Sequence, residues 1–224
     1  MVEGISAVLG FAVGVAISPV PIIAVILMLF SKRARVNGPA FAAGWVVALG
    51  VVSVVAYVLA VQGQEASESV TTDVVSWGKL LFGVLFLLLA VRNWRSRPAP
   101  GEAAPMPAWM AGIDGMAPVK ALVLGLLLAG VNPKNLMLAV AAGTAVAGLG
   151  LSSGDAAWSL VAFVVLGSLT IVVPVVYYLV GGAGAKTRLD HLKDWLAAHN
   201  NAVMAVLLLV FGVDLIAKAL PSLF

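Results

Sequence analysis

The sequence contains no cysteine and few charged residues. The absence of cysteine excludes a disulfide framework, a thiol relay and a thiolate metal site. Charged residues make up 10% of the chain, against about 25% in soluble domains, and 62% of the residues are hydrophobic. Such a chain cannot cover a surface that faces water, so we expect an integral membrane protein.

Motifs that carry chemistry are scarce as well. The two histidines, His191 and His199, lie outside the hydrophobic runs, and the sequence shows no carboxylate pair or metal motif, so we expect no enzyme, no metal and no cofactor. A Gly-x-x-x-x-Gly-Lys-Ser/Thr motif is missing, which leaves an ion gradient, a partner or the substrate's own gradient as the energy source for transport. The net charge is only +3, and the basic residues fall into three short loop clusters, so the sequence does not support nucleic-acid binding.

Six hydrophobic runs are long enough for the roughly 20 apolar residues that a transmembrane helix needs. They cover about 5–30, 39–61, 74–92, 118–147, 155–181 and 201–220. The first and fourth runs are too long for one simple crossing, and a proline-containing tetrapeptide interrupts each near its middle. The predicted fold is therefore an all-α integral membrane protein with six transmembrane helices, the first and fourth of them broken.

The basic residues orient these helices. Connections 31–38, 92–117 and 182–200 carry nine of the 13 Lys and Arg residues, and connections 62–73 and 148–154 carry none. The positive-inside rule places the three basic connections in the cytoplasm and both termini outside. We expect a multi-pass protein of the cytoplasmic membrane, with a short amphipathic helix on its inner surface in the last basic connection.

The two interrupted runs share a motif. Residues 17–22 and 131–136 match in register as aliphatic, small polar, Pro, any, Pro or polar, aliphatic, at an offset of 114. With three helices in each half, the second half enters the membrane upside down, as in the inverted repeats of secondary transporters. This predicts a 3+3 inverted repeat: residues 1–92, a cytoplasmic linker over 93–117, and residues 118–224. Chance similarity of two short proline motifs is the alternative.

The residues of the two breaks are the candidate substrate path. Proline removes an amide donor, and a broken backbone inside a membrane is tolerated where it lines a cavity or is packed in protein. Under the transporter interpretation the two breaks meet at the midplane and form the site. A structural kink with locally satisfied polar groups is the other interpretation. The residues concerned are Ser18, Pro19, Pro21, Asn132, Pro133, Lys134 and Asn135.

Lys134 and Asp214 are charged residues that lie well inside predicted helices. Lys134 follows the second break, where a lysine costs roughly 3 kcal/mol at mid-membrane, so we expect it to face a cavity or a partner. Asp214 lies at a similar depth in the sixth run. A structural ion pair with Lys134 and a proton-coupling role both remain open for Asp214, and Lys218 is a competing local partner.

A further cluster lies in the first cytoplasmic connection. Lys32, Arg33 and Arg35, followed by Asn37, have the charge to attract anionic lipid headgroups. Each basic residue near an acidic leaflet contributes about 1 kcal/mol. The alternative is that the cluster serves only as a positive-inside signal.

Three motifs together resemble the lysine exporter (LysE) superfamily: the Ser-Pro-x-Pro break, the Asn-Pro-Lys break and the stretch SKRARVNGPAFAAGW from Ser31 to Trp45. Within it the chain is most similar to the peptidoglycolipid addressing protein family (GAP, Sap-like). The resemblance covers most of the chain. It implies that residues 18–21 and 132–134 line the transport path. It also implies a role in moving glycolipids or other envelope lipids across the cytoplasmic membrane of Gram-positive bacteria with lipid-rich envelopes.

The sequence thus predicts an exporter or flippase for an envelope glycolipid or another lipid-linked substrate, working without ATP hydrolysis. Two alternatives remain: a small-solute exporter of the LysE type, for an amino acid or organic anion, and a non-transporting membrane assembly partner. The expected partners are membrane lipids and the lipid substrate. A homodimer or a larger export machinery is expected only by analogy with other small transporters.

Overall fold

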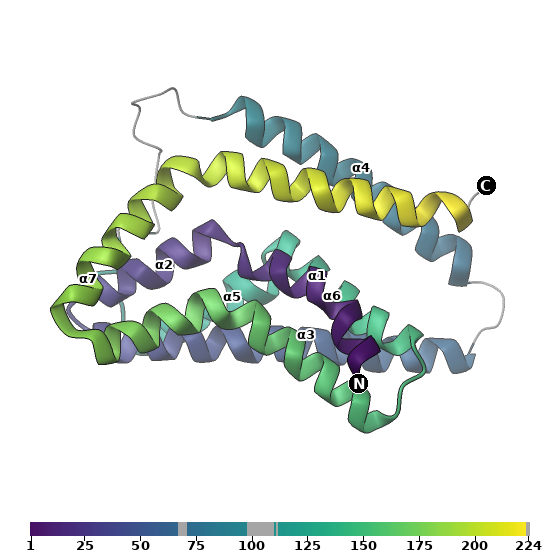
Figure 1. Ribbon diagram of the computed structural model, residues 1–224, viewed down its shortest axis with the longest axis horizontal. Coiled ribbons are helices and arrows are strands. Elements are labelled where there is room, and N and C mark those ends of the chain that lie inside the picture. Colours follow the sequence, from purple (N-terminus) through teal and green to yellow (C-terminus); the bar gives the residue numbers. More distant parts are fainter. Residues whose placement is uncertain (67–70, 98–109, 111, 223–224) are drawn as a thin grey trace. The chain divides into compact units, whose positions relative to one another are not determined.

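The computed structural model describes residues 1–66, 71–97, 110 and 112–222 (Figure 1). Within these residues every regular element is a helix, which confirms the all-α prediction. The elements are α1 (Val2–Ala16), α2 (Pro19–Phe30), α3 (Ala34–Ala66), α4 (Thr71–Arg95), α5 (Pro118–Gly130), α6 (Pro133–Gly148), α7 (Ser153–Ala219) and the short 3-10 helix η2 (Leu220–Ser222). Most of the predicted linker over 93–117 lies outside the described residues.

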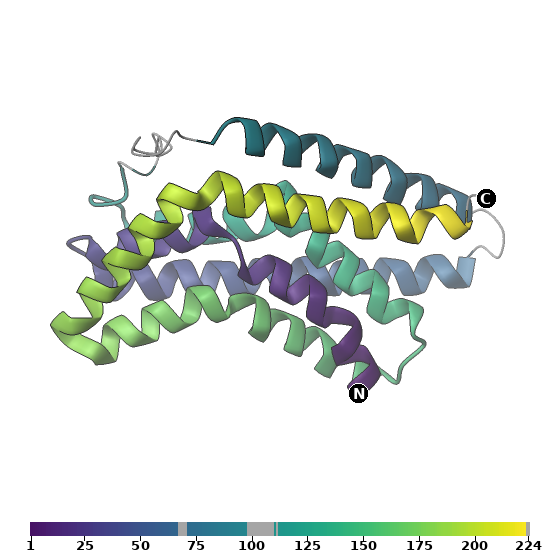
Figure 2. The same cartoon turned by 45° about the horizontal axis from the view of Figure 1, so that its top comes forward.

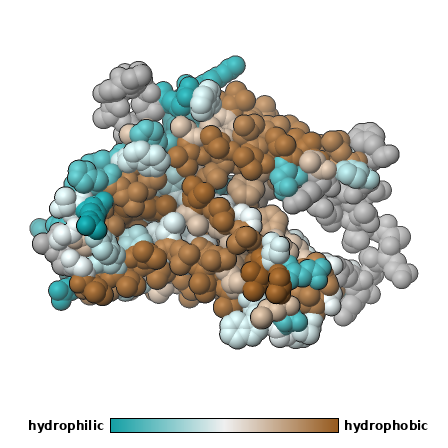
Figure 3. Space-filling view, viewed as in Figure 1, coloured by the Kyte–Doolittle hydropathy of each residue, from teal (hydrophilic) through white to brown (hydrophobic). Residues whose placement is uncertain are grey.

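Several of these helices have the length and hydropathy to cross a membrane. Three are single segments, Ala34–Gly63, Ser153–Gly181 and Gly184–Ala217. The pairs α1–α2 and α5–α6 pass the same test together as bent pairs, so the described residues contain three candidate spans, or up to five if each bent pair is one span. On the face shown in Figure 3, hydrophobic residues cover broad areas, as expected for a surface that faces lipid.

These five segments overlap five of the six predicted runs, although Gly184–Ala217 begins well before the predicted run 201–220. The third run, 74–92, lies in α4, many of whose side chains are outside the description, so the count of six and the inverted repeat stay predictions. Residues 182–200 were predicted as a connection with a short amphipathic helix; they are helical throughout and belong to α7, in which the first membrane-length segment ends at Gly181 and the next begins at Gly184. No proline follows Pro174 in this helix, so the backbone has an amide donor at every position there.

The chain forms two compact units. The first comprises Met1–Gln62 and Met106–Asp194, and the second Gly63–Pro105 and Trp195–Phe224. Each unit therefore draws on both halves of the sequence. The first unit contains both helix breaks, and the division into residues 1–92 and 118–224 stays a prediction.

Close backbone packing holds the first unit together. A Cβ on Gly44 of α3 would collide with the carbonyl oxygen of Leu122 in α5, and a Cβ on Gly125 with that of Phe41 in α3. Gly143 of α6 meets the Ser53 carbonyl in the same way. Glycine lets helix backbones approach this closely, so α3 fastens both helices of the second broken pair.

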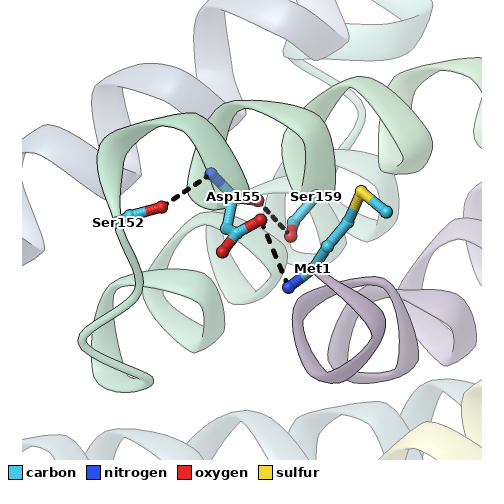
Figure 4. A network of polar contacts seen from close by, with 4 residues as sticks. All are labelled: Met1, Ser152, Asp155 and Ser159. Carbon is cyan, nitrogen blue, oxygen red and sulfur yellow. Dashed lines mark hydrogen bonds and ion pairs between the residues drawn. The ribbon is translucent and has the colours of Figure 1, made fainter.

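The first residue of the chain is tied to the start of α7 (Figure 4). The Met1 amino group lies 3.3 Å from Asp155 Oδ1. The Asp155 amide donates to Ser152 Oγ at 3.2 Å, and Ser159 Oγ donates to the Asp155 carbonyl at 2.7 Å. This network anchors the N-terminus of α1 against α7 within the first unit.

Candidate functional site

The two helix breaks are sharp bends in the first unit. The helix axes of α1 and α2 differ by 58°, and those of α5 and α6 by 64°. A short non-helical link joins α1 to α2 in both views (Figures 1 and 2). Pro19 and Pro133 are the first residues of α2 and α6, where a proline suits the start of a new helix. The prolines therefore end one helix and begin the next.

At the first break, the last carbonyls of α1 lose their usual donors. In an unbroken helix, the carbonyls of residues 14–17 would accept from the amides of residues 18–21. Pro19 and Pro21 have no N–H. The Ser18 amide donates instead to the Ala16 carbonyl at 3.0 Å. The carbonyls of residues 14, 15 and 17 must therefore be satisfied by other groups.

Lys134 supplies two of the missing donors from the second break. Its Nζ donates to the carbonyls of Gly14 at 2.8 Å and Ile17 at 2.9 Å, and to Ser18 Oγ at 2.8 Å. An ammonium has three protons, and these three oxygens match them. The positive charge also sits at the C-terminal end of α1, where the helix dipole favours a cation. Lys134 is thus a cap for the first broken helix.

Two hydroxyl groups complete the cap. Ser18 Oγ lies 2.6 Å from the Val15 carbonyl, and Thr170 Oγ1 of α7 donates to the Ala16 carbonyl at 2.7 Å. Thr170 was not among the residues predicted for the site. Its only sequence signal is a hydroxyl within the apolar run 155–181, and the sequence does not show which carbonyl it reaches.

Asn132 and Asn135 shape the second break. Asn132 Oδ1 accepts from the Lys134 amide at 3.1 Å as the N-cap of α6, a position that favours asparagine. Asn135 Nδ2 donates to the Leu128 carbonyl at 3.0 Å, and its Oδ1 lies 3.1 Å from Ser18 Oγ. Asn135 therefore stabilises its own break and links it to the first.

The junction of the two breaks is closed in this conformation. Ser18, Lys134 and Asn135 are exposed by only 1%, 5% and 0%. Pro19 and Pro21 are also buried, whereas Pro133 is exposed. The structure thus brings residues of both motifs together in a network of satisfied polar groups, with every ammonium proton engaged. Binding of a ligand to Lys134 requires one of its three bonds to open.

Asp214 lies on the part of α7 that belongs to the second unit. The ion pair with Lys134 and the proton-coupling role both stay predictions. The three acceptors of the Lys134 ammonium are two carbonyls and a hydroxyl, all on residues 14–18.

The predicted headgroup cluster divides into two environments. Lys32, Arg33 and Arg35 are exposed at the link between α2 and α3, as headgroup attraction requires. Asn37 is fully buried, and its Nδ2 donates to the Met116 carbonyl at 2.9 Å. Its role in headgroup attraction stays a prediction; in the structure its amide joins the start of α3 to the chain before α5.

Two lysines of α7 lie over the ring of Phe30, at the end of α2. Lys186 Nζ is 5.4 Å and Lys193 Nζ 5.7 Å from the ring centroid. Lys193 is also bonded to Asp190 at 2.6 Å and lies 3.3 Å from Asp194. Lys186 therefore adds positive charge next to the exposed cluster, and acidic neighbours balance the charge of Lys193.

Comparisons with known proteins bear on the identity of the chain. The search of curated proteins and the search of solved structures each gave no match. A family model described as "Sap, sulfolipid-1-addressing protein" matches residues 8–220, which include both breaks and the buried junction between them. Membership of the wider LysE superfamily stays a prediction. The chain belongs to the sulfolipid-1-addressing protein (Sap) family.

Proposed function

We propose that this protein exports or flips an anionic envelope lipid across the cytoplasmic membrane without hydrolysing ATP. The observation that carries the proposal is the buried ammonium of Lys134, which joins the two broken helices through the carbonyls of Gly14 and Ile17. The family is named for addressing sulfolipid-1, and a sulfolipid headgroup is an anion. A buried cation at a helix break suits such a headgroup.

The transport step is an exchange of partners at Lys134. An anionic oxygen forms a stronger, charge-assisted hydrogen bond with an ammonium than a neutral carbonyl does. When the headgroup accepts the hydrogen bonds that the Lys134 ammonium otherwise donates to Gly14 O and Ile17 O, the C-terminal end of α1 loses its cap. The angle between α1 and α2 is then free to change, as in hinge motions that expose a site to the other side.

Two features support an alternating mechanism on the inverted-repeat plan. The breaks lie at an offset of 114 residues in the sequence, and the two bends of 58° and 64° are similar. Inverted repeats with interrupted helices place their site where the breaks meet. The exposed residues Lys32, Arg33 and Arg35, with Lys186 nearby in α7, collect anionic headgroups before the transport step.

Reconstituted protein tests the proposal directly. Proteoliposomes without nucleotide are loaded with a fluorescent sulfated glycolipid, a zwitterionic lipid with the same chains, or radiolabelled amino acids. Movement of the sulfated lipid alone supports the proposal. Transport of amino acids without lipid movement assigns the protein to the small-solute exporters. Movement of neither substrate, in protein that is folded, supports the assembly-partner alternative.

A matched pair of variants tests the role of the buried lysine. Lys134→Met removes the ammonium but keeps an unbranched side chain, and it should abolish movement of the sulfated lipid. Lys120→Met makes the same change at an exposed lysine in the first turn of α5 and should leave the rate unchanged. Full activity of Lys134→Met, at equal expression and folding, contradicts the assignment of the site.

A further inference from the structure

One face of α4 carries exposed leucines along its length and exposed arginines at its C-terminal end. Leu81, Leu85 and Leu88 are exposed by 67%, 43% and 64%. Arg92 and Arg95 follow, also exposed. The spacings of four, three, four and three residues place all five side chains on one face of a helix. An apolar stripe therefore leads directly to two guanidinium groups.

A surface groove lies where this stripe reaches the arginines. Its volume is about 490 Å³, and it is lined by Leu88, Val91, Arg92, Arg95 and Ser96. The lining thus combines two apolar side chains with two cations and a hydroxyl-bearing residue. All of them belong to the second unit, whereas the buried junction of the helix breaks belongs to the first.

The groove rests on an ordered framework. Ser96 Oγ donates to the Arg92 carbonyl at 2.9 Å, and Asn201 Nδ2 of α7 donates to the Ser96 carbonyl at 2.6 Å. Along the same helices, Gly83 and Gly212 allow close packing of α4 against the last part of α7. The end of α4 is therefore held in place by α7 within this unit.

The third arginine of the segment is engaged differently. The guanidinium of Arg97 lies 3.4 Å from the centroid of the Trp94 ring, and its Nε donates to the Trp94 carbonyl at 2.8 Å. The ion pairs found among the described residues use the Met1 amino group and side chains of α7. None of these ion pairs of the described residues uses Arg92 or Arg95. Their exposed guanidinium groups are therefore accessible to an external anion.

We propose that this groove binds an anionic phospholipid of the inner leaflet. Arg92 and Arg95 hold the phosphate, for which the guanidinium geometry is well suited, and one acyl chain lies along the leucine stripe. From Leu81 to Arg92 the helix rises about 16 Å at 1.5 Å per residue. That length is close to half of a hydrocarbon core about 30 Å thick, the depth that one leaflet's chains occupy. The stripe therefore selects a lipid over a free phosphate.

Native mass spectrometry of the full chain in detergent tests the proposal. Phosphatidylglycerol and phosphatidylcholine with identical chains are titrated, and the anionic lipid should bind at least five times more tightly. Arg92→Gln and Arg95→Gln should each weaken phosphatidylglycerol binding about fivefold. Arg97→Gln removes the same charge from the same segment but lies outside the groove, and it should change binding less than twofold.

Two further arms identify the ligand. A short-chain phosphatidylglycerol should bind more weakly than the long-chain lipid, and millimolar glycerol phosphate should leave the lipid bound. Equal binding of the two headgroup types overturns the proposal even if a variant fails to fold. Equal loss in all three arginine variants, displacement by glycerol phosphate, or a dimer that excludes lipid also overturns it. If the unmodified protein binds phosphatidylglycerol as expected but does not move the sulfated lipid, only the proposed function is rejected.

Discussion

Replacing Ser18 by alanine isolates the contribution of one hydroxyl group to the first helix break. Ser18 Oγ lies 2.6 Å from the Val15 carbonyl and accepts a hydrogen bond from Lys134 Nζ at 2.8 Å. In an unbroken helix the Val15 carbonyl would accept from residue 19, which is a proline without an N–H. Ser18→Ala therefore leaves a buried carbonyl without its donor and an ammonium without one of its acceptors.

The size of the effect follows from these two losses. An unsatisfied buried polar group costs about 1–3 kcal/mol, and a hydrogen bond to a charged group contributes about 1.5–3 kcal/mol. Taking the middle of each range, Ser18→Ala should destabilise the protein by about 4 kcal/mol if nothing rearranges. For a chain of this length, each kcal/mol lowers Tm by roughly 2–4 °C, so the expected fall is about 8–16 °C.

Thermal unfolding in detergent, followed by tryptophan fluorescence, measures this shift. Ser53→Ala is the matched control, because Ser53 is also fully buried and its Oγ donates to the Gly50 carbonyl at 3.2 Å. Gly50 lies inside the unbroken helix α3, where its carbonyl keeps a backbone donor. The control should shift Tm by less than about 2 °C. A shift below 2 °C for Ser18→Ala, or equal shifts for both, refutes the capping argument.

Three further results follow from the same geometry. Thr170→Val should lower stability by only about 1 kcal/mol in the same assay, because the carbonyl that it caps also accepts a backbone amide; a loss above about 3 kcal/mol contradicts this. Lys134→Met should reduce sulfated-lipid transport at least tenfold and Lys120→Met should not, and equal rates remove Lys134 from the site. Gly44→Ala should cost more than about 2 kcal/mol because its Cβ meets the backbone of α5. Gly50→Ala in the same helix meets nothing within 4 Å and should be neutral or stabilising by up to about 1 kcal/mol.

The helix breaks could be predicted from the sequence because proline acts locally. Pro19 and Pro133 each remove an amide donor and crowd the preceding turn, and both breaks were found at the predicted motifs. The membrane character was predictable as well, since it depends on composition and on the length of apolar runs. The extent of α7 was not, because the leucine spacing in 189–196 predicted a short helix but did not show that this helix joins the segments on both sides.

The partners of the site residues could not be predicted from their positions in the chain. Lys134 was recognised as a costly buried charge, but its three acceptors lie 116–120 residues away in sequence. Asn37 looked like part of an exposed cluster because its neighbours are basic, yet the fold turns it inward to the Met116 carbonyl. Such contacts depend on how helices meet, which local patterns do not encode.

The sequence by itself determined the solvent of this protein and the places where its helices break. Apolar runs and a charge content of 10% require a lipid environment, and prolines interrupt hydrogen bonding wherever they stand in a helix. Only the tertiary structure decided what repairs the break. Carbonyls stranded in a dry interior must find donors, and the packing of α1 along α6 brought Lys134 to two of them. Lys134, which was expected to face a cavity or a partner, caps the C-terminal end of α1.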